Sequence, residues 1–289
     1  MKSGLIAINL AAIIFGTAAL FGELHVSPFW IVGCRAGFAS LALIIVGMVR
    51  GGLHPKSAAK NWRLFLLTGV LLATHWLTFF ASVQLAGIPI ATLTFASFPL
   101  FTVLIETFRS KRKPHWYEVA AGIAIIIAVS LLVDLHAEGT AMWGLVSGFA
   151  SAITFAIFGI QAKHLTAKFT SLTVSFVQNV IVFLCMLPVM PFTEPKPESF
   201  ETMGWLVILG VVTTALMHQL YLFALTKLSA STCSAFIALE PVYAVLFAAL
   251  LFNQPLTGWV VLSGVLIVAA SIVLLRSEAK ETHRAAVID

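Results

Sequence analysis

The sequence predicts an all-α integral membrane protein with ten transmembrane helices, arranged as two inverted five-helix repeats around a central cavity. Of its 289 residues, 60% are hydrophobic and only 10% are charged, whereas soluble domains carry about 25% charged residues. The apolar runs approach twenty residues, which matches a hydrocarbon layer of roughly 30 Å at 1.5 Å per helical residue. The two halves of the chain also share landmarks in the same order.

Ten apolar stretches are candidate spans, and the loops between them are short. Their predicted ranges are 4–22, 28–49, 63–83, 88–108, 116–134, 140–161, 171–192, 203–224, 230–252 and 256–275. Short loops make consecutive spans antiparallel neighbours, because the chain has no length to cross the bundle between them.

The basic residues orient these spans. An even number of spans places both termini on one side, and all of the 17 Lys and Arg residues except Lys196 and Arg35 then fall on that side or at its membrane boundary. Cytoplasmic loops are enriched in Lys and Arg. The sequence therefore predicts a multi-pass protein of the inner (plasma) membrane with cytoplasmic termini. Because the net charge of +5 is spread over these loops, no nucleic-acid partner is expected.

Two stretches, His75 to Pro99 and His218 to Pro241, show the repeat most clearly. Each opens on a His, has a Phe-Ala pair whose Ala lies six residues after that His, and reaches a Pro within its second helix. Allowing one residue of slip, Phe98 corresponds to Glu240. Five spans per half is an odd number, so the second half enters the membrane from the opposite side. The predicted division is 1–135, 136–276 and a cytoplasmic tail, 277–289.

Ionisable residues inside spans are costly in lipid and are therefore candidates for function. Glu240 lies about ten residues into its span, near the membrane midplane. It either binds a cation or proton, or caps backbone donors where Pro241 disturbs the helix. His75 and His218 either hydrogen-bond a substrate or pack as neutral core residues. Arg35 either binds a substrate carboxylate or, as the favoured interpretation, is structural and reaches outward or pairs with Glu23.

Aromatic side chains share helix faces with small hydroxyls. Ser97 and Phe98 lie on one face of their span, and Phe79 follows His75 by one helical turn. In the second half, Phe155 and Phe158 are three residues apart. Such faces suit a flat, amphipathic substrate, although plain helix packing would use the same residues. The candidate substrate-binding residues are His75, Phe79, Ser97, Phe98, Phe155, Phe158, His218 and Glu240.

Several kinds of chemistry lack their sequence motifs. No glycine-rich loop ends in Lys-Ser or Lys-Thr, so no ATP-driven motor is expected, and neither HExxH nor G-x-S-x-G occurs. The His, Cys and carboxylate residues have no metal-ligand spacing within a helix. Three cysteines inside apolar segments do not suggest disulfides. We therefore expect no catalytic residues, no metal and no cofactor, and energy from a gradient with a proton as the candidate coupling ion.

The last two spans resemble a known family. They carry Ala235 to Pro241, then Phe252-Asn253-Gln254-Pro255-Leu256-Thr257, then Gly264 to Leu275. With these motifs the whole chain resembles the ten-helix branch of the drug/metabolite transporter superfamily, the EamA-type exporters. Members usually carry an acidic residue where Gln254 stands. The resemblance implies a central cavity lined by spans 1, 3, 4, 6, 8 and 9.

The resulting expectation is a secondary transporter, not an enzyme, that works by alternating access. Its expected partners are a small-molecule substrate and membrane lipid. Its expected activity is export of aromatic or other hydrophobic amino acids or related metabolites. One alternative is transport of organic cations (amines or quaternary ammonium), with Glu240 as the counter-charge. Another alternative, from a different class, is an intramembrane enzyme acting on lipid, with His and Glu240 as acid and base. A passive channel is disfavoured because polar residues are scattered.

Overall fold

The structure is a computed structural model that describes residues 2–111, 113–131, 139–237, 239–252, 256–270 and 272–273. Its elements are α1 (Lys2–Ala18), η1 (Ala19–Glu23), α2 (Pro28–Arg50), α3 (Pro55–Ala58), η2 (Ala59–Asn61), α4 (Trp62–Phe95), α5 (Phe98–Arg109), α6 (Trp116–Ser130), α7 (Gly139–Thr166), α8 (Ser171–Met186), η3 (Met190–Phe192), α9 (Phe200–Gly210), η4 (Val211–Leu216), α10 (Met217–Lys227), α11 (Ala230–Ile237), α12 (Glu240–Phe252) and a last helix, Gly258–Ala270. The predicted boundary at 135/136, the tail 277–289 and residue Gln254 lie outside the described residues.

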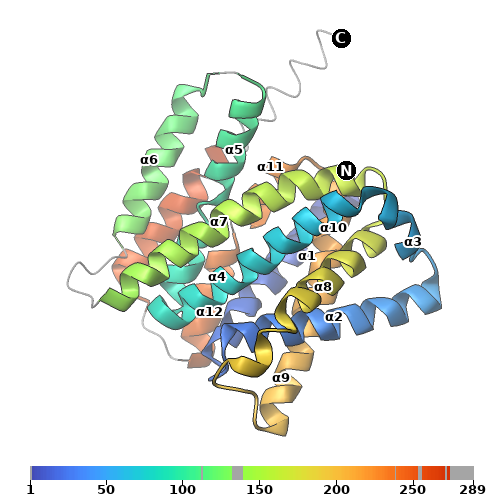
Figure 1. The fold of residues 1–289 in the computed structure, drawn as a ribbon. Helices are drawn as coiled ribbons and strands as arrows, with labels where there is room; N and C mark the ends of the chain where they lie inside the picture. Colours follow the sequence, from blue (N-terminus) through green and yellow to red (C-terminus); the bar gives the residue numbers. More distant parts are fainter. Residues whose placement is uncertain are drawn as a thin grey trace, which may run out of the picture.

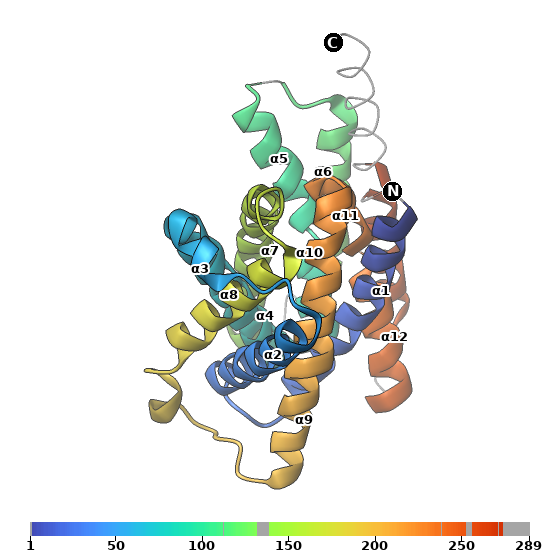
Figure 2. The same ribbon diagram turned by 90° about the vertical axis from the view of Figure 1, so that its right-hand side faces the viewer.

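The helices form one bundle, with α5 and α6 at one end and α9 at the other (Figures 1 and 2). Six helical stretches among the described residues are long and apolar enough to cross a membrane: Lys2–Glu23, Pro28–Arg50, Pro55–Phe95, Gly139–Thr166, Ser171–Phe192 and Phe200–Lys227. The outer surface is apolar as well, since Met48, Phe108 and Leu250 are each more than 70% exposed. The prediction of an all-helical, multi-pass membrane protein is confirmed. The ten-span, two-repeat layout remains a prediction.

The predicted spans 63–83 and 88–108 meet at a single glycine inside α4. Gly87 has a φ of +83°, a left-handed conformation that glycine adopts without a side-chain clash. The Phe95 ring after this point lies 5.0 Å from the His75 ring and 5.6 Å from the Phe79 ring before it. The last part of α4 therefore turns back along the first part, and the predicted loop is reduced to one non-helical glycine.

Both helices predicted to carry an internal proline are broken there. The helix after Gly87 stops at Phe95, and α5 restarts with Phe98-Pro99. In the second half α11 stops at Ile237, and α12 starts with Glu240-Pro241. Proline lacks an N–H and disfavours helical geometry in the residue before it. Each break leaves the residue before the proline, Phe98 or Glu240, at the start of a new helix in the protein interior.

Within the described residues, the most extensive helix packing joins α4 and α7, which run side by side (Figure 1). A Cβ on Gly144 would lie 2.4 Å from the Ala86 Cβ, and a Cβ on Gly148 would lie 2.9 Å from the Thr94 Cβ. The Ser82 hydroxyl donates a 2.7 Å hydrogen bond to the Gly144 carbonyl. Without large side chains between them, the backbones approach closely, as helices do in membranes. Helix α7 thus holds both arms of α4.

We predict that Gly144→Val lowers the free energy of unfolding by about 1–3 kcal/mol, because the added methyl groups overpack the α4–α7 contact. The measurement is the thermal unfolding midpoint in detergent. Gly204→Val is the matched control, since a Cβ at that α9 position meets no atom within 4 Å. Equal midpoints for the two variants would contradict the close packing.

Candidate binding site

A small cavity lies in the centre of the bundle, and charged side chains of both signs face it. Its volume is about 10 Å³, which is room for about one water molecule. Residues from α1, α2, α4 and α12 line it: Phe15, Ala18, Arg35, His75, Trp76, Phe79, Phe95 and Glu240. It is therefore the place where the first and last parts of the chain bring polar groups together inside an aromatic shell.

Arg35 is the largest charged group in the interior and is only 2% exposed. The interpretation that it reaches outward or pairs with Glu23 is wrong. Its guanidinium carbon lies 4.0 Å from the centre of the Trp76 ring and 5.4 Å from that of Phe80. The negative faces of aromatic rings attract a desolvated cation. Helix α2 therefore points its charge inward, and two rings of α4 hold it.

A π-helical segment supplies the next partner of Arg35. The Nε–H of Arg35 donates a 3.0 Å hydrogen bond to the Thr214 hydroxyl oxygen. Thr214 lies in η4, and its own hydroxyl donates to the carbonyl of Leu209, five residues earlier, at 2.7 Å. The hydroxyl that accepts the hydrogen bond from Arg35 therefore belongs to a π-helical turn. Such turns are frequent at functional sites.

Glu240 faces the same cavity as Arg35 and is 1% exposed. It is the first residue of α12, directly before Pro241. Its Oε2 atom is buried and has no hydrogen-bond partner among the described residues. A buried polar atom without a partner costs about 1–3 kcal/mol, and more when it is charged. This oxygen is available to a ligand or a proton.

His75 lies between the charged groups and the rings. Its Nδ1 contacts the hydroxyl of Ser151 at 2.8 Å and the carbonyl oxygen of Ser151 at 3.2 Å. The imidazole lies 4.7 Å from the Phe155 ring and 5.0 Å from the Phe95 ring, centre to centre. One side of His75 is therefore fixed by α7, while the residue also lines the cavity.

An aromatic wall continues from His75 to His218. Phe155 lies 5.1 Å from Phe98 and 5.7 Å from Phe158, and Phe158 lies 5.7 Å from His218, measured between ring centres. The Nε2 atom of His218 is 3.1 Å from the Gln178 side-chain oxygen on α8. These rings are buried, and they form an apolar surface against which a flat group can stack.

The structure brings seven of the eight predicted site residues together in this region. Three line the cavity and four belong to the wall: His75, Phe79 and Glu240, then Phe98, Phe155, Phe158 and His218. Ser97 is buried, but its hydroxyl donates to the Thr94 carbonyl at 2.7 Å within the helix break. Their role in binding stays a prediction.

Sequence reasoning missed Trp76 and Phe95 as members of the site, and it favoured a structural role for Arg35 over binding of a substrate carboxylate. Trp76 follows His75 directly, so only the rotation of α4 decides that both face the cavity. Phe95 faces His75 because α4 reverses at Gly87. An arginine inside an apolar span was the available signal, since charges there usually face the bundle interior.

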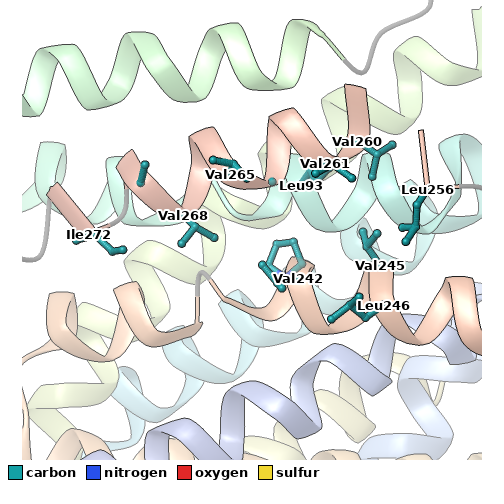
Figure 3. A pocket seen from close by; sticks show the side chains of 13 residues that line it. Leu93, Val242, Val245, Leu246, Leu256, Val260, Val261, Val265, Val268 and Ile272 are labelled. Carbon is teal, nitrogen blue, oxygen red and sulfur yellow. The ribbon is translucent and has the colours of Figure 1, made fainter. Parts of the chain in front are cut away.

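A larger groove lies between α12 and the last helix (Figure 3). Its volume is about 460 Å³, and its lining consists of apolar side chains such as Val242, Val265 and Ile272, together with glycine and proline. Among the described residues, its lining offers no charged or hydroxyl side chain with which to orient a polar solute. The central cavity is therefore the better candidate for binding a polar metabolite.

One family profile matches nearly the whole chain, and individual proteins resemble the chain over most of its length. The sequence profile of the EamA-like transporter family matches residues 2–134 and, a second time, residues 142–276. An S-adenosylmethionine uptake transporter of Rickettsia conorii is 25% identical over 252 residues, covering 86% of this chain and 83% of the relative. A biotin transporter of Escherichia coli is 25% identical over 217 residues, covering 72% and 70%. A solved crystal structure with 18% identity aligns with a TM-score of 0.70 over 94% of this chain and 97% of that chain.

We predict that Thr214→Val destabilises the protein by about 1–3 kcal/mol more than Thr213→Val, because it leaves the buried Nε–H of Arg35 without an acceptor. Thr213 is a close control: it is also buried, and its hydroxyl also donates to the Leu209 carbonyl, at 2.8 Å. Thermal unfolding of the two purified variants in one detergent measures the difference. A Thr213 variant that is equally or more destabilised would refute this role of Thr214.

Proposed function

Because the chain belongs to the EamA-like transporter family, within the drug/metabolite transporter superfamily, we propose that it is a secondary transporter that binds its substrate at the central cavity. The relatives are named as transporters of small molecules. The proposed cycle is alternating access in the inner membrane, with both termini in the cytoplasm and a gradient as the energy source. The proposed direction is export.

Two observations support the proposed ten-helix, inverted-repeat architecture. The family profile matches the chain twice in succession. The helix breaks at Phe98-Pro99 and Glu240-Pro241 also occupy corresponding places in the two matched segments. Transporters with inverted repeats commonly bind substrate where broken helices from the two halves meet. The central cavity fits that position, since both Phe95, before the first break, and Glu240 line it.

The chemistry of the cavity favours a zwitterion with a flat or apolar side chain, that is, an aromatic or other hydrophobic amino acid. Arg35 is a donor for a carboxylate, and the unpartnered Oε2 of Glu240 is an acceptor for an ammonium group. The rings of Phe79, Phe95 and Phe155 then receive the side chain. The presence of Arg35 and Glu240, which have opposite formal charges, on one cavity with an aromatic lining is the observation that carries this proposal.

Binding requires movement, because a cavity of about 10 Å³ is too small for an amino acid. In the proposed cycle the helices around Trp76 and Phe79 separate to admit substrate, and the substrate carboxylate competes with Thr214 for Arg35. Exchange of one partner for another avoids leaving the guanidinium unpaired in a low-dielectric interior. The structure then corresponds to a state that is closed around the site.

The names of the relatives are compatible with this chemistry. S-adenosylmethionine, which the Rickettsia conorii relative is named for, carries an α-amino acid group and a flat base. Biotin, which the Escherichia coli relative is named for, has a carboxylate but no ammonium group. Both compounds therefore belong in a binding panel, where they separate recognition of a zwitterion from recognition of an anion.

One other function has a specific observation in its favour. An organic cation would use Glu240 as its counter-charge and the neighbouring rings as a cage, and it would have no use for Arg35.

The second alternative, an intramembrane enzyme acting on lipid, needs a nucleophile or metal beside His75 and Glu240. The names within the family indicate transporters, so we rank it last.

We predict that L-tryptophan raises the thermal unfolding midpoint of the purified protein, because a ligand that binds only the folded state stabilises it. Tryptamine, which lacks the carboxylate, and indole-3-propionate, which lacks the ammonium group, should produce little shift. Glu240→Gln and Phe98→Ala should each weaken L-tryptophan binding by about tenfold or more, the scale of one charge-assisted hydrogen bond or one buried ring contact. Leucine, S-adenosylmethionine, biotin and tetraethylammonium complete the panel.

Two variants serve as controls in the same assay. Glu201→Gln and Arg63→Gln remove exposed charges outside the cavity and should leave the L-tryptophan shift unchanged. A shift with tetraethylammonium alone, lost in Glu240→Gln, would replace the amino-acid proposal with the cation alternative. An L-tryptophan shift that survives both Glu240→Gln and Phe98→Ala would place binding outside this cavity and refute the proposal.

A further inference from the structure

A second groove runs along the outer side of α2. None of its described lining residues lines the central cavity. Its volume is about 630 Å³. One wall is the second half of α2, including Leu43 and Val46, and the other wall is formed by Val211, Ala215 and Leu216 of η4. The two walls run together, because Gly210, just before η4, packs against Phe38 and Ala39 of α2. The groove is thus an apolar trough along the membrane-facing surface.

The trough ends in a polar mouth at the end of α2. Arg50, Gly51, Gly52, Thr170, Ser171 and Gln219 line this end. Arg50 is exposed and, within the described part of the chain, is the one lining residue with a formal charge. A groove with apolar walls in the bilayer and a cation at its end matches the division of a phospholipid into acyl chain and phosphate.

Hydrogen bonds hold the mouth in shape. The Thr170 hydroxyl donates to the Gly52 carbonyl at 2.8 Å, and the Thr173 hydroxyl also approaches it, at 3.3 Å. Gly51 and Gly52 have φ values of +72° and +83°, and a Cβ on either would meet no atom within 4 Å. The loop after α2 is therefore anchored to the start of α8 while its outer face stays open.

Gln219 holds the Ser171 side chain at the mouth. Its side-chain N–H donates to the Ser171 hydroxyl oxygen at 2.6 Å, which orients the amide. Its oxygen, Oε1, is buried and has no hydrogen-bond partner among the described residues. Because this oxygen is enclosed, the polar groups that the mouth offers to a ligand are the Arg50 guanidinium and the Ser171 hydroxyl, which suit an anion.

We propose that this groove is a binding site for an anionic phospholipid of the surrounding bilayer. Its phosphate lies against Arg50 and the Ser171 hydroxyl, and one acyl chain fills the trough beside Val46 and Leu216. Basic pockets between membrane helices bind anionic headgroups in this manner. The site is independent of the proposed transport substrate, since it shares no lining residue with the central cavity.

The occupant is a lipid and not a free anion, because a free anion would use only the mouth. A phospholipid covers both the cation and the apolar walls, among which Val211, Val46 and Leu216 are 39–50% exposed. Acyl chains are also the solvent that these helices meet in a membrane. The two parts of the groove therefore make separate, testable contributions.

The test is native mass spectrometry of the full chain in detergent with added phosphatidylglycerol, phosphatidylcholine of identical acyl chains, or inorganic phosphate. We expect retention of phosphatidylglycerol in preference to phosphatidylcholine, and about fivefold weaker phosphatidylglycerol binding in Arg50→Gln, the effect of one basic residue near a membrane surface. Arg63→Gln, which removes a nearby exposed arginine outside the groove, is the matched control and should bind as the parent protein does.

A second pair of variants tests the acyl part. Val46→Trp narrows the trough and should weaken phosphatidylglycerol binding, whereas Met48→Trp, on the same helix but outside the lining and 73% exposed, should not. Equal retention of the two lipids, or unchanged binding in Arg50→Gln, would overturn the headgroup site. Inorganic phosphate that competes fully with the lipid, or equal behaviour of the two Trp variants, would overturn the lipid as its occupant.

Discussion

The buried guanidinium of Arg35 is the constraint on which the centre of this protein depends. A charge in a hydrocarbon-like interior is tolerated only when its surroundings replace water. Here three elements do so: α4 places Trp76 4.0 Å from the guanidinium carbon, η4 provides the Thr214 hydroxyl, and α12 places Glu240 on the same cavity. Elements that lie far apart in the sequence therefore contact or face the same guanidinium group.

Helix breaks complete this arrangement. Side chains in a continuous helix point away from the helix axis. Where a helix stops and restarts at a proline, the first side chain of the new helix can take another direction. Glu240 begins α12 in this way, and Phe98 begins α5. The left-handed Gly87 serves the same region by turning Phe95 toward His75. The two helix breaks place Phe98 and Glu240 in the buried interior, where irregular backbone is shielded from lipid.

Much of this could be predicted from local sequence. Apolar runs predicted the membrane helices, and the X-Pro pairs predicted where two helices are disturbed. His75, Phe79 and Glu240 were identified because polar and aromatic residues inside apolar spans are conspicuous, and they line the cavity. The inward direction of Arg35 could not be predicted, because it depends on Trp76 and Thr214, which lie 41 and 179 positions away. The use of the Ser97 hydroxyl within its own helix break likewise depends on local geometry.

The most direct test of the central claim is an experimental structure of the protein with L-tryptophan bound. The account predicts a carboxylate within hydrogen-bond distance of Arg35, an ammonium group at Glu240 and an indole ring against Phe155. It also predicts that the bundle is more open around Trp76 and Phe79 than in the structure described above. L-tryptophan bound elsewhere, with Arg35 still donating to Thr214 and Glu240 without contact, would contradict it.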